Sequence, residues 1–544
     1  MTDTADLNRT TTTTPITTTT ATRRQLLVGG AAVAAFGLAA ARTTPAYAAT
    51  FTTAPAARSR EPGRVDRGTI SRWARDTWAS LVAMTDPQTG LPADNISGPL
   101  ASPKRSGYTS PTNIGGYLWS TVVARELGII SAGECHRRLT TTLTTVSRLK
   151  HHEPSGMFYN WYDEASGDVI TVWPENGSIV YPFLSSVDNG WFAASLMVVR
   201  NAEPRVARLA NALLDTMNFG MYYNKDARPG IGGLLRGGFW DAQPAGGFVK
   251  GNYLGNGPDV FYTQNHYDIL VSEPRIATYI GIAHGQIPPE AYFATMRTFP
   301  DNWDWQEMKP VGGHHTYMGI DVFEGAYTYR GMHIVPSWGG DMFEALMPDL
   351  FVPEASWAPR SWGINHALTV RAQREFGLDD AKYGYWGFSP ASRPGGGYSA
   401  WGVDAIGMDP GGYPSDMEGT NYYDGSYGPR NDGSSPNPTW GDGVVTPHAA
   451  FLAMPYEPRQ AYDNLVKIER ELKAYGEGGF YDAVAVKSGL IAERYLSLDQ
   501  SMVLGAIGNV FSDNVIRRNF IKGGVKSTLK PLIGIEEFGA GVIS

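Results

Sequence analysis

The chain has almost no cysteine: Cys135 is the single one among 544 residues. One cysteine cannot form a disulfide within its own chain, so such bonds contribute nothing to the stability of this protein. Basic runs are also missing, because lysine and arginine occur singly or in short pairs and the net charge is −8. A nucleic-acid partner normally requires a basic stripe that displaces counterions from phosphates. We therefore expect no nucleic-acid partner.

No long apolar segment follows the N-terminal region. There, a pair of arginines that begins at Arg23 precedes an apolar run over residues 26–41. This run is shorter than the roughly 20 residues of a spanning helix, and an Ala-Tyr-Ala sequence ending at Ala48 supplies a cleavage site. The pattern predicts a twin-arginine signal peptide over residues 1–48 and a mobile segment over residues 49–63. We expect export from a bacterial cytoplasm and no membrane association after cleavage, the alternative being an uncleaved anchor.

Motifs for metal ions, phosphates and serine nucleophiles are missing as well. Adjacent histidines at 151–152 and 314–315 lack the His-Glu-x-x-His spacing of a zinc site. The chain contains no Gly-x-Ser-x-Gly elbow and no Gly-rich phosphate loop. Acidic residues crowd the Gly-rich region 404–432 without the ligand order of an EF-hand, and turn chemistry explains most aspartates in such loops. We expect no cofactor and no metal, although the sequence leaves calcium binding in region 404–432 open.

Aromatic residues, by contrast, are abundant. The chain has 15 Trp, 28 Tyr and 21 Phe, many of them beside Gly, Asn and Asp in segments that look like loops. Rings beside polar side chains suit sugars, whose C–H faces stack on aromatic rings while the hydroxyl groups form hydrogen bonds. Packing within the fold is the alternative use of the same rings.

Apolar periodicity predicts a series of helical hairpins separated by long loops. The expected helices cover residues 72–84, 111–127, 131–149, 189–202, 204–217, 273–285, 289–298, 446–454, 458–475 and 499–509. Strand signals are weak, and the Gly-rich stretches 230–265 and 383–443 are expected to be functional loops. The hairpins are too irregular in length for a solenoid. We therefore predict an all-α fold, an (α/α)6 toroid formed by residues 64–544 as one domain, with long loops over one mouth.

Carboxylates stand at four of the predicted helix starts. These are Asp188, Glu273, Asp341 with Glu344, and Asp499. Helix capping explains an acid at such a position, and Asp341 and Glu344 have the spacing of a capping box. In a toroid, however, the inner helices all start near one end, so these carboxylates would converge on one mouth. Glycosidic bond cleavage requires such a cluster, with one carboxyl protonated and another ionised.

Eight short motifs, taken in order over residues 105–510, give the chain a family resemblance. They are residues 108–115, 158–163, 186–190, 272–276, 337–348, 361–364, 479–482 and 499–502. With them the chain resembles the glycoamylase-like family. That family includes the endo-β-1,2-glucanases of glycoside hydrolase family 144 and the cyclisation domain of cyclic β-1,2-glucan synthases.

The resemblance implies an α/α toroid with a large central cavity and a glycoside hydrolase that acts on a polysaccharide or oligosaccharide. It implies that Glu273 is the general acid, that Asp188 lines the same pocket and that Glu344 is a further carboxylate of the site. The implied substrate-binding residues are Tyr159, Trp161, Asp163, Asn189, Arg275, Trp338, Trp362 and Asp499.

Three departures from the family pattern fall near these positions. Asn365 and His366 stand where the family usually has Ser-Glu, Pro274 stands for Ala, and Trp191 stands for a smaller polar residue. We expect these changes to affect the identity of the glucan more than the type of reaction.

The expected reaction is hydrolysis with inversion by a monomer, in which Glu273 donates the proton and Asp188 or Glu344 supplies the second function. Three alternatives remain open at this point. The first is a retaining transglycosylase on the same scaffold. The second is a polysaccharide lyase that uses Tyr159, His266 and Tyr267. The third is a glycan-binding protein without catalytic activity.

Overall fold

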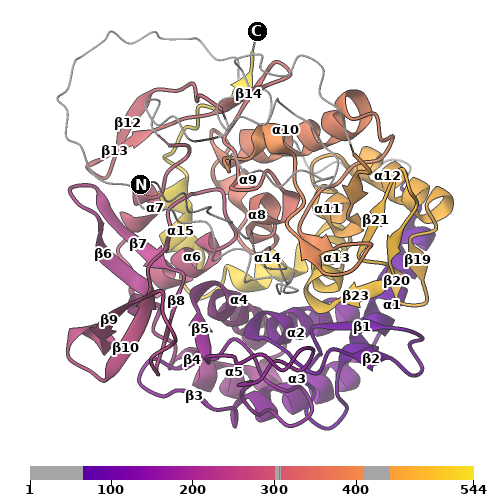
Figure 1. The fold of residues 1–544 in the computed structure, drawn as a ribbon, viewed down its shortest axis with the longest axis horizontal. Helices are drawn as coiled ribbons and strands as arrows, with labels where there is room; N and C mark the ends of the chain where they lie inside the picture. Colours follow the sequence, from indigo (N-terminus) through magenta and orange to yellow (C-terminus); the bar gives the residue numbers. More distant parts are fainter. Residues whose placement is uncertain (1–64, 300–305, 307, 410–440, 544) are drawn as a thin grey trace, which may run out of the picture.

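The computed structural model describes residues 65–299, 306, 308–409 and 441–543, so the predicted signal peptide (1–48) and the segment 49–63 lie outside the described residues. Six helices form a ring (Figure 1). They are α2 (Pro111–Glu126), α4 (Ser186–Ala202), α6 (Arg275–Ala283), α8 (Met342–Leu346), α11 (Pro447–Leu452) and α13 (Ser497–Phe511). Helix α2 packs on α4, α4 on α6, α8 on α11, α11 on α13 and α13 on α2. Between α6 and α8, the Arg275 guanidinium donates to the carbonyls of Glu344 and Ala345.

A second set of helices lies outside this ring. They are α1 (Arg67–Met84), α3 (Ala132–Val146), α5 (Ala207–Leu214), α7 (Ala291–Ala294), α10 (Trp362–Glu375) and α12 (Pro458–Glu471). Each packs on a ring helix next to it in the chain, and α1 also packs on α13. The ring helices are buried on nearly every side, whereas α3 and α12 bury one apolar stripe. Several of these inner and outer helices form the paired hairpins that the periodicity predicts, such as α2 with α3 and α11 with α12.

Glycines bring the ring helices together near their starts. A Cβ at Gly115 of α2 would lie 3.1 Å from the Trp191 carbonyl oxygen of α4. A Cβ at Gly190 of α4 would lie 2.9 Å from the Ala277 Cβ of α6, and one at Gly116 would meet a serine of α13 at 2.6 Å. Only glycine fits such close backbone approaches. The helix starts, and whatever polar groups they carry, are therefore held close to one another.

Many short strands accompany the helices, so the predicted all-α class is wrong in this respect. A four-stranded sheet in the order β5-β8-β10-β9 and a three-stranded sheet in the order β11-β7-β6 take up the stretch 230–265, which was expected to be a loop. Their bounds are β5 (Phe183–Ser185), β6 (Tyr223–Arg228), β7 (Gly232–Arg236), β8 (Gly238–Trp240), β9 (Phe248–Asn252), β10 (Asp259–Thr263) and β11 (His266–Tyr267). Frequent glycines hide the alternation of these strands in the sequence.

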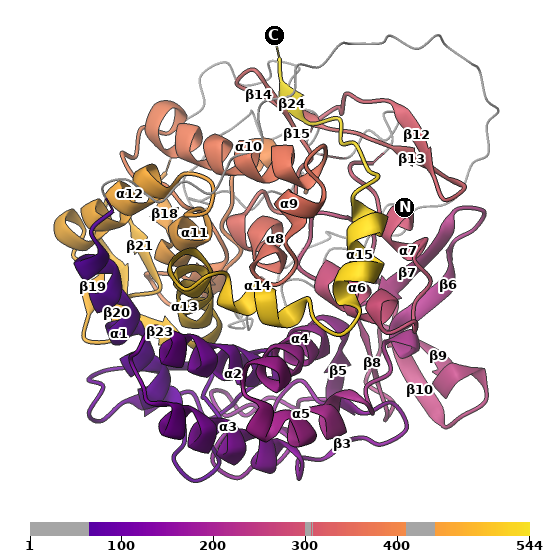
Figure 2. The same cartoon turned by 180° about the vertical axis from the view of Figure 1, so that it is seen from behind.

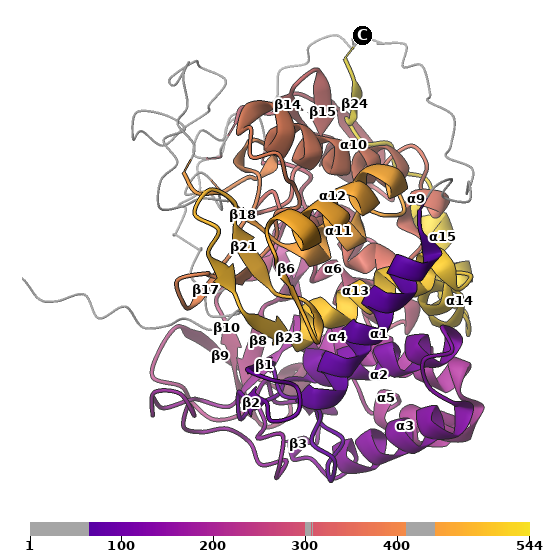
Figure 3. The ribbon, with the colours of Figure 1, turned by 90° about the vertical axis from the view of Figure 1, so that its right-hand side faces the viewer.

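The remaining elements are also short. They are α9 (Glu354–Trp357), α14 (Val515–Phe520), α15 (Val525–Ile533), β1 (Asn95–Ser97), β2 (Lys104–Arg105), β3 (His151–His152), β4 (Met157–Phe158), β12 (His314–Tyr317), β13 (Ile320–Phe323), β14 (Tyr327–Tyr329), β15 (Met332–Ile334), β16 (Ala391–Ser392), β17 (Tyr398–Ser399), β18 (Val444–Val445), β19 (Tyr475–Gly476), β20 (Gly479–Phe480), β21 (Ala483–Ala485), β22 (Ile491–Ala492), β23 (Arg494–Leu496) and β24 (Gly541–Val542). Strands β5, β18 and β23 lead into α4, α11 and α13, and β18 and β23 lie to the left of α11 and α13 in Figure 3.

The opposite end of the ring is filled. Seen from behind, α14 lies across it, between α13 and α15 (Figure 2). Phe351 contacts the rings of Trp119, Trp191 and Phe520, with centroids 5.2, 5.6 and 5.7 Å away. Such edge-to-face and tilted contacts are the geometry that aromatic pairs prefer. A site built on the helix starts would therefore lie on the strand side of the ring, above an aromatic floor.

Two further properties concern the single cysteine and the length and polarity of the helices. Cys135 is fully buried on the apolar stripe of α3, and burial raises the pKa of its thiol to about 11. Across the described residues, every helix is too short or too polar to pass through a bilayer.

Candidate active site

The carboxylates predicted at helix starts are all buried. The exposed fractions are 0% for Asp188, 3% for Glu273, 1% for Asp341, 3% for Glu344 and 2% for Asp499. We call the first four the carboxylate arc, because they lie at the starts of the consecutive ring helices α4, α6 and α8. A buried carboxylate is costly unless it is compensated or has a function. The contacts of each one separate these two possibilities.

Asp188 lies in the first turn of α4 but does not cap it. Ser185 is the cap, since its Oγ accepts a hydrogen bond from the Asp188 backbone N–H at 3.2 Å. The Asp188 carboxylate instead accepts from Thr112 Oγ1 at 2.7 Å and faces the side-chain NH2 of Asn160 at 2.6 Å. Both groups donate to the carboxylate, which favours its ionised form. Asp188 is therefore a buried carboxylate in the first turn of α4 with two side-chain donors.

Glu273 occupies the turn before α6. Its backbone carbonyl accepts from Ile276, and Pro274 supplies a backbone angle suited to a helix start. Its side chain lies against α4, where the Trp191 indole Nε1 donates to Oε2 at 2.8 Å. Trp191 follows Asp188 by three residues on the same helix face. One turn of α4 thus provides both Asp188 and the partner of Glu273.

Asp341 and Glu344 are neighbouring acids at the start of α8. Asp341 caps the helix through a hydrogen bond from the Glu344 backbone N–H at 2.8 Å, and Glu344 Oε2 accepts from the Gly339 N–H at 2.9 Å. Capping, the alternative raised from the sequence, thus holds for this pair. Burial, the charge of Glu344 and the charge of Glu273 raise the pKa of Asp341 well above its usual range. Burial also raises the pKa of Glu344. The influence of Glu273 on Asp341 links α6 to α8 within the arc.

Asp499 belongs to a separate cluster that sequence reasoning missed. It lies 3.6 Å from His448 Nδ1, measured from Oδ2, and beside Asp482. Burial and the neighbouring Asp499 raise the pKa of Asp482 well above its usual range. Asp482 also accepts from the Ser392 backbone N–H at 2.6 Å. One available signal was the motif at 479–482, which ends on Asp482.

Two groups among the described residues have the spacing of metal ligands. His448, Asp482 and Asp499 place their ligand atoms within 4.8 Å of one another. In that cluster, burial and Asp499 favour the protonated form of Asp482, which is a poorer metal ligand than a carboxylate. The other group, Asp349, Glu354 and His366, is taken up by protein partners, as described next. In the acid-rich region 404–432, residues 410–432 lie outside the described residues.

The second buried charged region is an ion-pair network around Glu354. Arg275 binds Glu354 through two hydrogen bonds of 2.7 and 2.9 Å, and His366 Nε2 lies 3.0 Å from the same carboxylate. Burial acts to raise the pKa of Glu354, but Arg275 and His366 outweigh it and lower the pKa to about 2. Asp349 is held by Arg517 at 2.5 Å and by Tyr456 at 2.7 Å. This network is charge-compensated and structural in character.

Three residues implied as sugar contacts make contacts within the protein. Arg275 belongs to the ion-pair network, and its guanidinium lies 4.6 Å from the centre of the Trp362 ring. Trp362 is fully buried and donates its indole N–H to Tyr292 at 2.9 Å. The Asn189 amide bonds the backbone of Phe158 at 2.8 and 3.0 Å. These contacts are those of packing residues.

Trp161 and Trp338 lie near the arc and are only partly buried. The Trp161 indole N–H lies 3.2 Å from the amide oxygen of Asn160, the residue whose NH2 faces Asp188. Trp338 directly precedes Gly339, whose N–H binds Glu344. Because they are partly buried and lie near the arc, these two rings are the candidates for a sugar-binding wall.

Tyr159 and Asp163, implied for the same wall, have local partners. The Tyr159 hydroxyl donates to Asp241, and Asp163 accepts from the N–H groups of Ala165 and Ser166 at 2.9 and 2.8 Å in a turn. His266, proposed for a lyase, bonds Asn224 at 2.9 Å, and burial together with Arg236 lowers its pKa to about 4.

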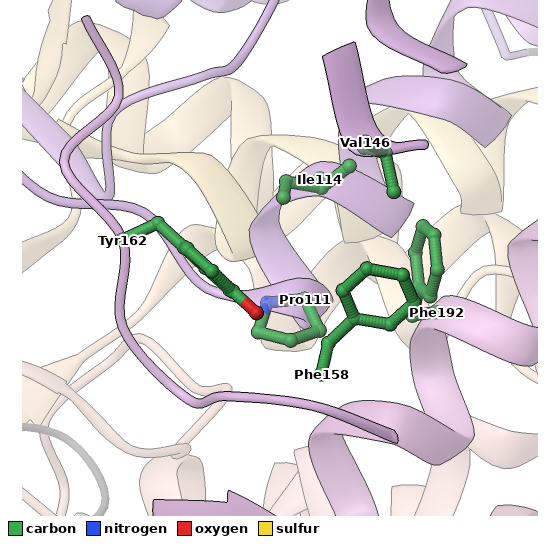
Figure 4. A pocket seen from close by; sticks show the side chains of 6 residues that line it. All are labelled: Pro111, Ile114, Val146, Phe158, Tyr162 and Phe192. Atoms are coloured by element: carbon green, nitrogen blue, oxygen red, sulfur yellow. The ribbon is translucent and has the colours of Figure 1, made fainter. Parts of the chain in front are cut away.

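A small hollow elsewhere in the fold is unsuited to a sugar (Figure 4). It is lined by Pro111, Ile114, Val146, Phe158, Tyr162 and Phe192. Its single side-chain polar group, the Tyr162 hydroxyl, donates to the Lys150 carbonyl at 2.7 Å. Sugar hydroxyl groups would find no hydrogen-bond partners among these side chains.

Two family models match separate parts of the chain. Residues 313–522 match the Glycoamylase family, described as "Putative glucoamylase", and residues 72–226 match a family described as "Protein of unknown function (DUF3131)". The first match spans the motifs at 337–348 and 479–482. The predicted resemblance to the glycoamylase-like family is confirmed.

Known proteins show the same relationship. The chain is 23% identical over 567 residues to the cyclic beta-(1,2)-glucan synthase NdvB of Rhizobium meliloti (strain 1021). That alignment covers 82% of this chain and 18% of NdvB, so this chain spans less than a fifth of the relative's length.

Solved structures share the fold. The endo-beta-1,2-glucanase from Chitinophaga pinensis, in complex with sophorotriose and glucose, has a TM-score of 0.58 at 15% identity, covering 86% of this chain and 98% of that one. The endo-beta-1,2-glucanase from Talaromyces funiculosus, in complex with sophorose, has a TM-score of 0.56 at 11% identity, covering 86% and 90%. At these identities the likeness establishes the fold.

Proposed function

We propose that this chain is an exported glycoside hydrolase that cleaves a β-1,2-glucan or a related polysaccharide or oligosaccharide. The observation that carries the proposal is the carboxylate arc. One turn of α4 carries both Asp188 and Trp191, and the Trp191 indole N–H binds Glu273. The glycoamylase-like match and the names of the relatives support the reaction type and the glucan. The arginine pair and the cleavage sequence that ends at Ala48 support export.

In the proposed reaction, Glu273 donates its proton to the glycosidic oxygen as the bond from that oxygen to the sugar carbon breaks. Water attacks the same carbon from the opposite face and loses a proton to Asp188. Asp188 suits the role of base because Thr112 and Asn160 favour its ionised form. Glu344 suits it less, since its carboxylate is held by the Gly339 N–H at the start of α8. This reaction inverts the configuration of the anomeric carbon.

The test is incubation of the purified protein, from residue 49 onward, with linear β-1,2-glucan, followed by proton NMR of the first product. We expect new reducing ends and an α-anomer that appears before mutarotation. Other linear glucans and bacterial envelope glycans form the comparison panel. If the protein binds these glycans and cleaves none of them, it is a glycan-binding protein. An unsaturated, ultraviolet-absorbing product would show a lyase.

A retaining transglycosylase is the second candidate, and the similarity to NdvB, a cyclic beta-(1,2)-glucan synthase, favours it specifically. A transglycosylase transfers the cleaved chain to a sugar hydroxyl, so total reducing ends stay constant while chain lengths change. Counting reducing ends against the size distribution of the products separates the two reactions. An increase in reducing ends that matches the number of broken bonds identifies the hydrolase.

A further inference from the structure

We infer that Trp191 is a positioning residue for the proton donor: its indole N–H selects which oxygen of Glu273 carries the catalytic proton. This inference rests on the proposed function. It goes beyond it by assigning a role to a residue that stands where the resembled family has a smaller polar side chain. The evidence is the contact from Trp191 Nε1 to Glu273 Oε2, 2.8 Å long and fully inside the protein.

The direction of this contact follows from the chemistry of the two groups. An indole N–H is a donor and never an acceptor. Oε2 therefore presents a lone pair to Trp191, and because a carbonyl oxygen accepts more strongly than a hydroxyl oxygen, Oε2 is favoured as the carbonyl oxygen of the protonated acid. The proton is then favoured on Oε1, which in the proposed reaction is the oxygen that protonates the glycosidic oxygen. Trp191 thus fixes the orientation of the acid before the substrate arrives.

The helix packing holds the indole in place. Gly190 lets α4 approach α6 so closely that a Cβ there would lie 2.9 Å from the Ala277 Cβ. On its other side, the Trp191 ring contacts Phe351 at 5.6 Å between centroids, and both residues are fully buried. A side chain fixed by packing orients a catalytic group more precisely than a mobile one.

The contact also affects the titration of Glu273. A donated N–H stabilises the ionised carboxylate, whereas the charges of Glu273 and Asp341 of α8 act against each other. Arg275, on the element that follows Glu273, binds Glu354. Removal of the N–H takes away this hydrogen bond, so the ionised form of Glu273 loses stabilisation relative to the protonated form.

The test compares Trp191→Phe with Trp119→Phe. Trp119 is an equally buried indole that contacts the same Phe351 ring, but its N–H donates to the Ser501 carbonyl at 3.0 Å. For Trp191→Phe we expect kcat to fall about tenfold with KM unchanged, and the alkaline limb of kcat/KM to move up by about one pH unit. Trp119→Phe should leave the pH profile in place. Identical profiles for the two variants would overturn the inference.

A second measurement needs no tryptophan variant. Nitrogen-15 indole NMR of the wild-type protein should show one of the 15 tryptophan N–H resonances titrating with the pH of the alkaline limb. In Glu273→Gln that titration should be absent, and a titration that persists there would contradict the inference. Turnover retained by Glu273→Gln would overturn the proposed function itself. An inactive Glu273→Gln with a normal Trp191→Phe profile would overturn the role of Trp191 alone.

Discussion

The carboxylate arc and the ion-pair network are equally buried, yet the pKa of Asp341 in the arc and the pKa of Glu354 in the network are shifted in opposite directions. Glu354 and Asp341 are 0% and 1% exposed. Arg275 and His366 overcome burial and lower the pKa of Glu354 to about 2, whereas burial and neighbouring carboxylates raise the pKa of Asp341 well above its usual range. Burial alone therefore does not distinguish the two regions; the charge of the neighbours does.

This difference separates the structural role of the ion-pair network from the catalytic role proposed for the carboxylate arc. The Arg275 side chain donates to the last carbonyls of the short helix α8, whose start carries Asp341 and Glu344. The compensated network thus holds in place a helix whose start carries acids that repel one another, Asp341 and Glu344. Uncompensated buried acids cost stability, and sites of catalysis are where proteins accept this cost.

The largest expected loss of stability comes from breaking the network. Glu354→Gln keeps the shape of the side chain but leaves the buried Arg275 without its counter-charge. We expect the free energy of unfolding to fall by about 3–5 kcal/mol in a urea titration. The control is Glu469→Gln, which breaks the partly exposed Arg72–Glu469 pair of 2.7 Å and should cost less than about 1 kcal/mol. Equal losses in the two variants would remove the distinction between the network and ordinary ion pairs.

A smaller loss is expected where the arc depends on helix packing. Gly190→Ala places a methyl group 2.9 Å from the Ala277 Cβ, so α4 and α6 must move apart. We expect a loss of about 1–3 kcal/mol and, because Trp191 then leaves Glu273, reduced turnover. Gly133→Ala on α3, whose nearest neighbouring atom lies 3.8 Å away, should cost nothing. Full stability and turnover of Gly190→Ala would show that the close approach is unimportant.

The smallest effect has the opposite sign. The raised pKa of Asp341 means that its stabilising contribution, complete at low pH, is lost as the pH rises through the folded-state value. Asn also caps helices but stays neutral. At pH 8 the free energy of unfolding of Asp341→Asn should therefore exceed that of the wild type by about 1 kcal/mol, and at pH 4 the two should be nearly equal. The measurement is urea unfolding at both pH values.

Asp66 is the matched control for that trend. It caps α1 from an exposed position, and hydrogen bonds from Thr69 and Gly68 lower its pKa. Its stabilising contribution is therefore present at neutral pH and lost on acidification. Asp66→Asn should be less stable than the wild type at pH 8. The same sign of change in both variants would contradict the assignment of Asp341 to an uncompensated arc.

Local signals made much of the helical framework predictable. Pro111 and Pro458 stand in the first turns of α2 and α12, and Ser131 caps α3. These residues act within one turn, so a single sequence reveals them. Helix α10 escaped prediction because polar residues such as His366 and Gln373 are buried on it, which blurs its apolar stripe. Of the helix predicted over residues 289–298, only the four residues of α7 are helical.

The site was predictable where a role depends on position along a helix. Asp188 and Glu273 were expected at helix starts and are there. Arg275, Trp362 and Asn189 were assigned to sugar because motif membership does not reveal that Glu354, Tyr292 and Phe158 lie beside them.

The departures at Asn365 and His366 fall away from the arc. His366 lies at Glu354, and Asn365 bonds the Val335 backbone at 2.9 and 3.0 Å. The departure at Trp191, by contrast, falls on the proposed proton donor. Such long-range partners are set by the ring closure, which no local pattern encodes.

Turnover of linear β-1,2-glucan by Glu273→Gln tests the account most directly. Gln keeps the size of the side chain and can accept from Trp191, but it has no proton to donate to the glycosidic oxygen. We predict that turnover falls by at least about a thousandfold while urea unfolding shows stability equal to or above that of the wild type. Turnover within tenfold of the wild type would contradict the account.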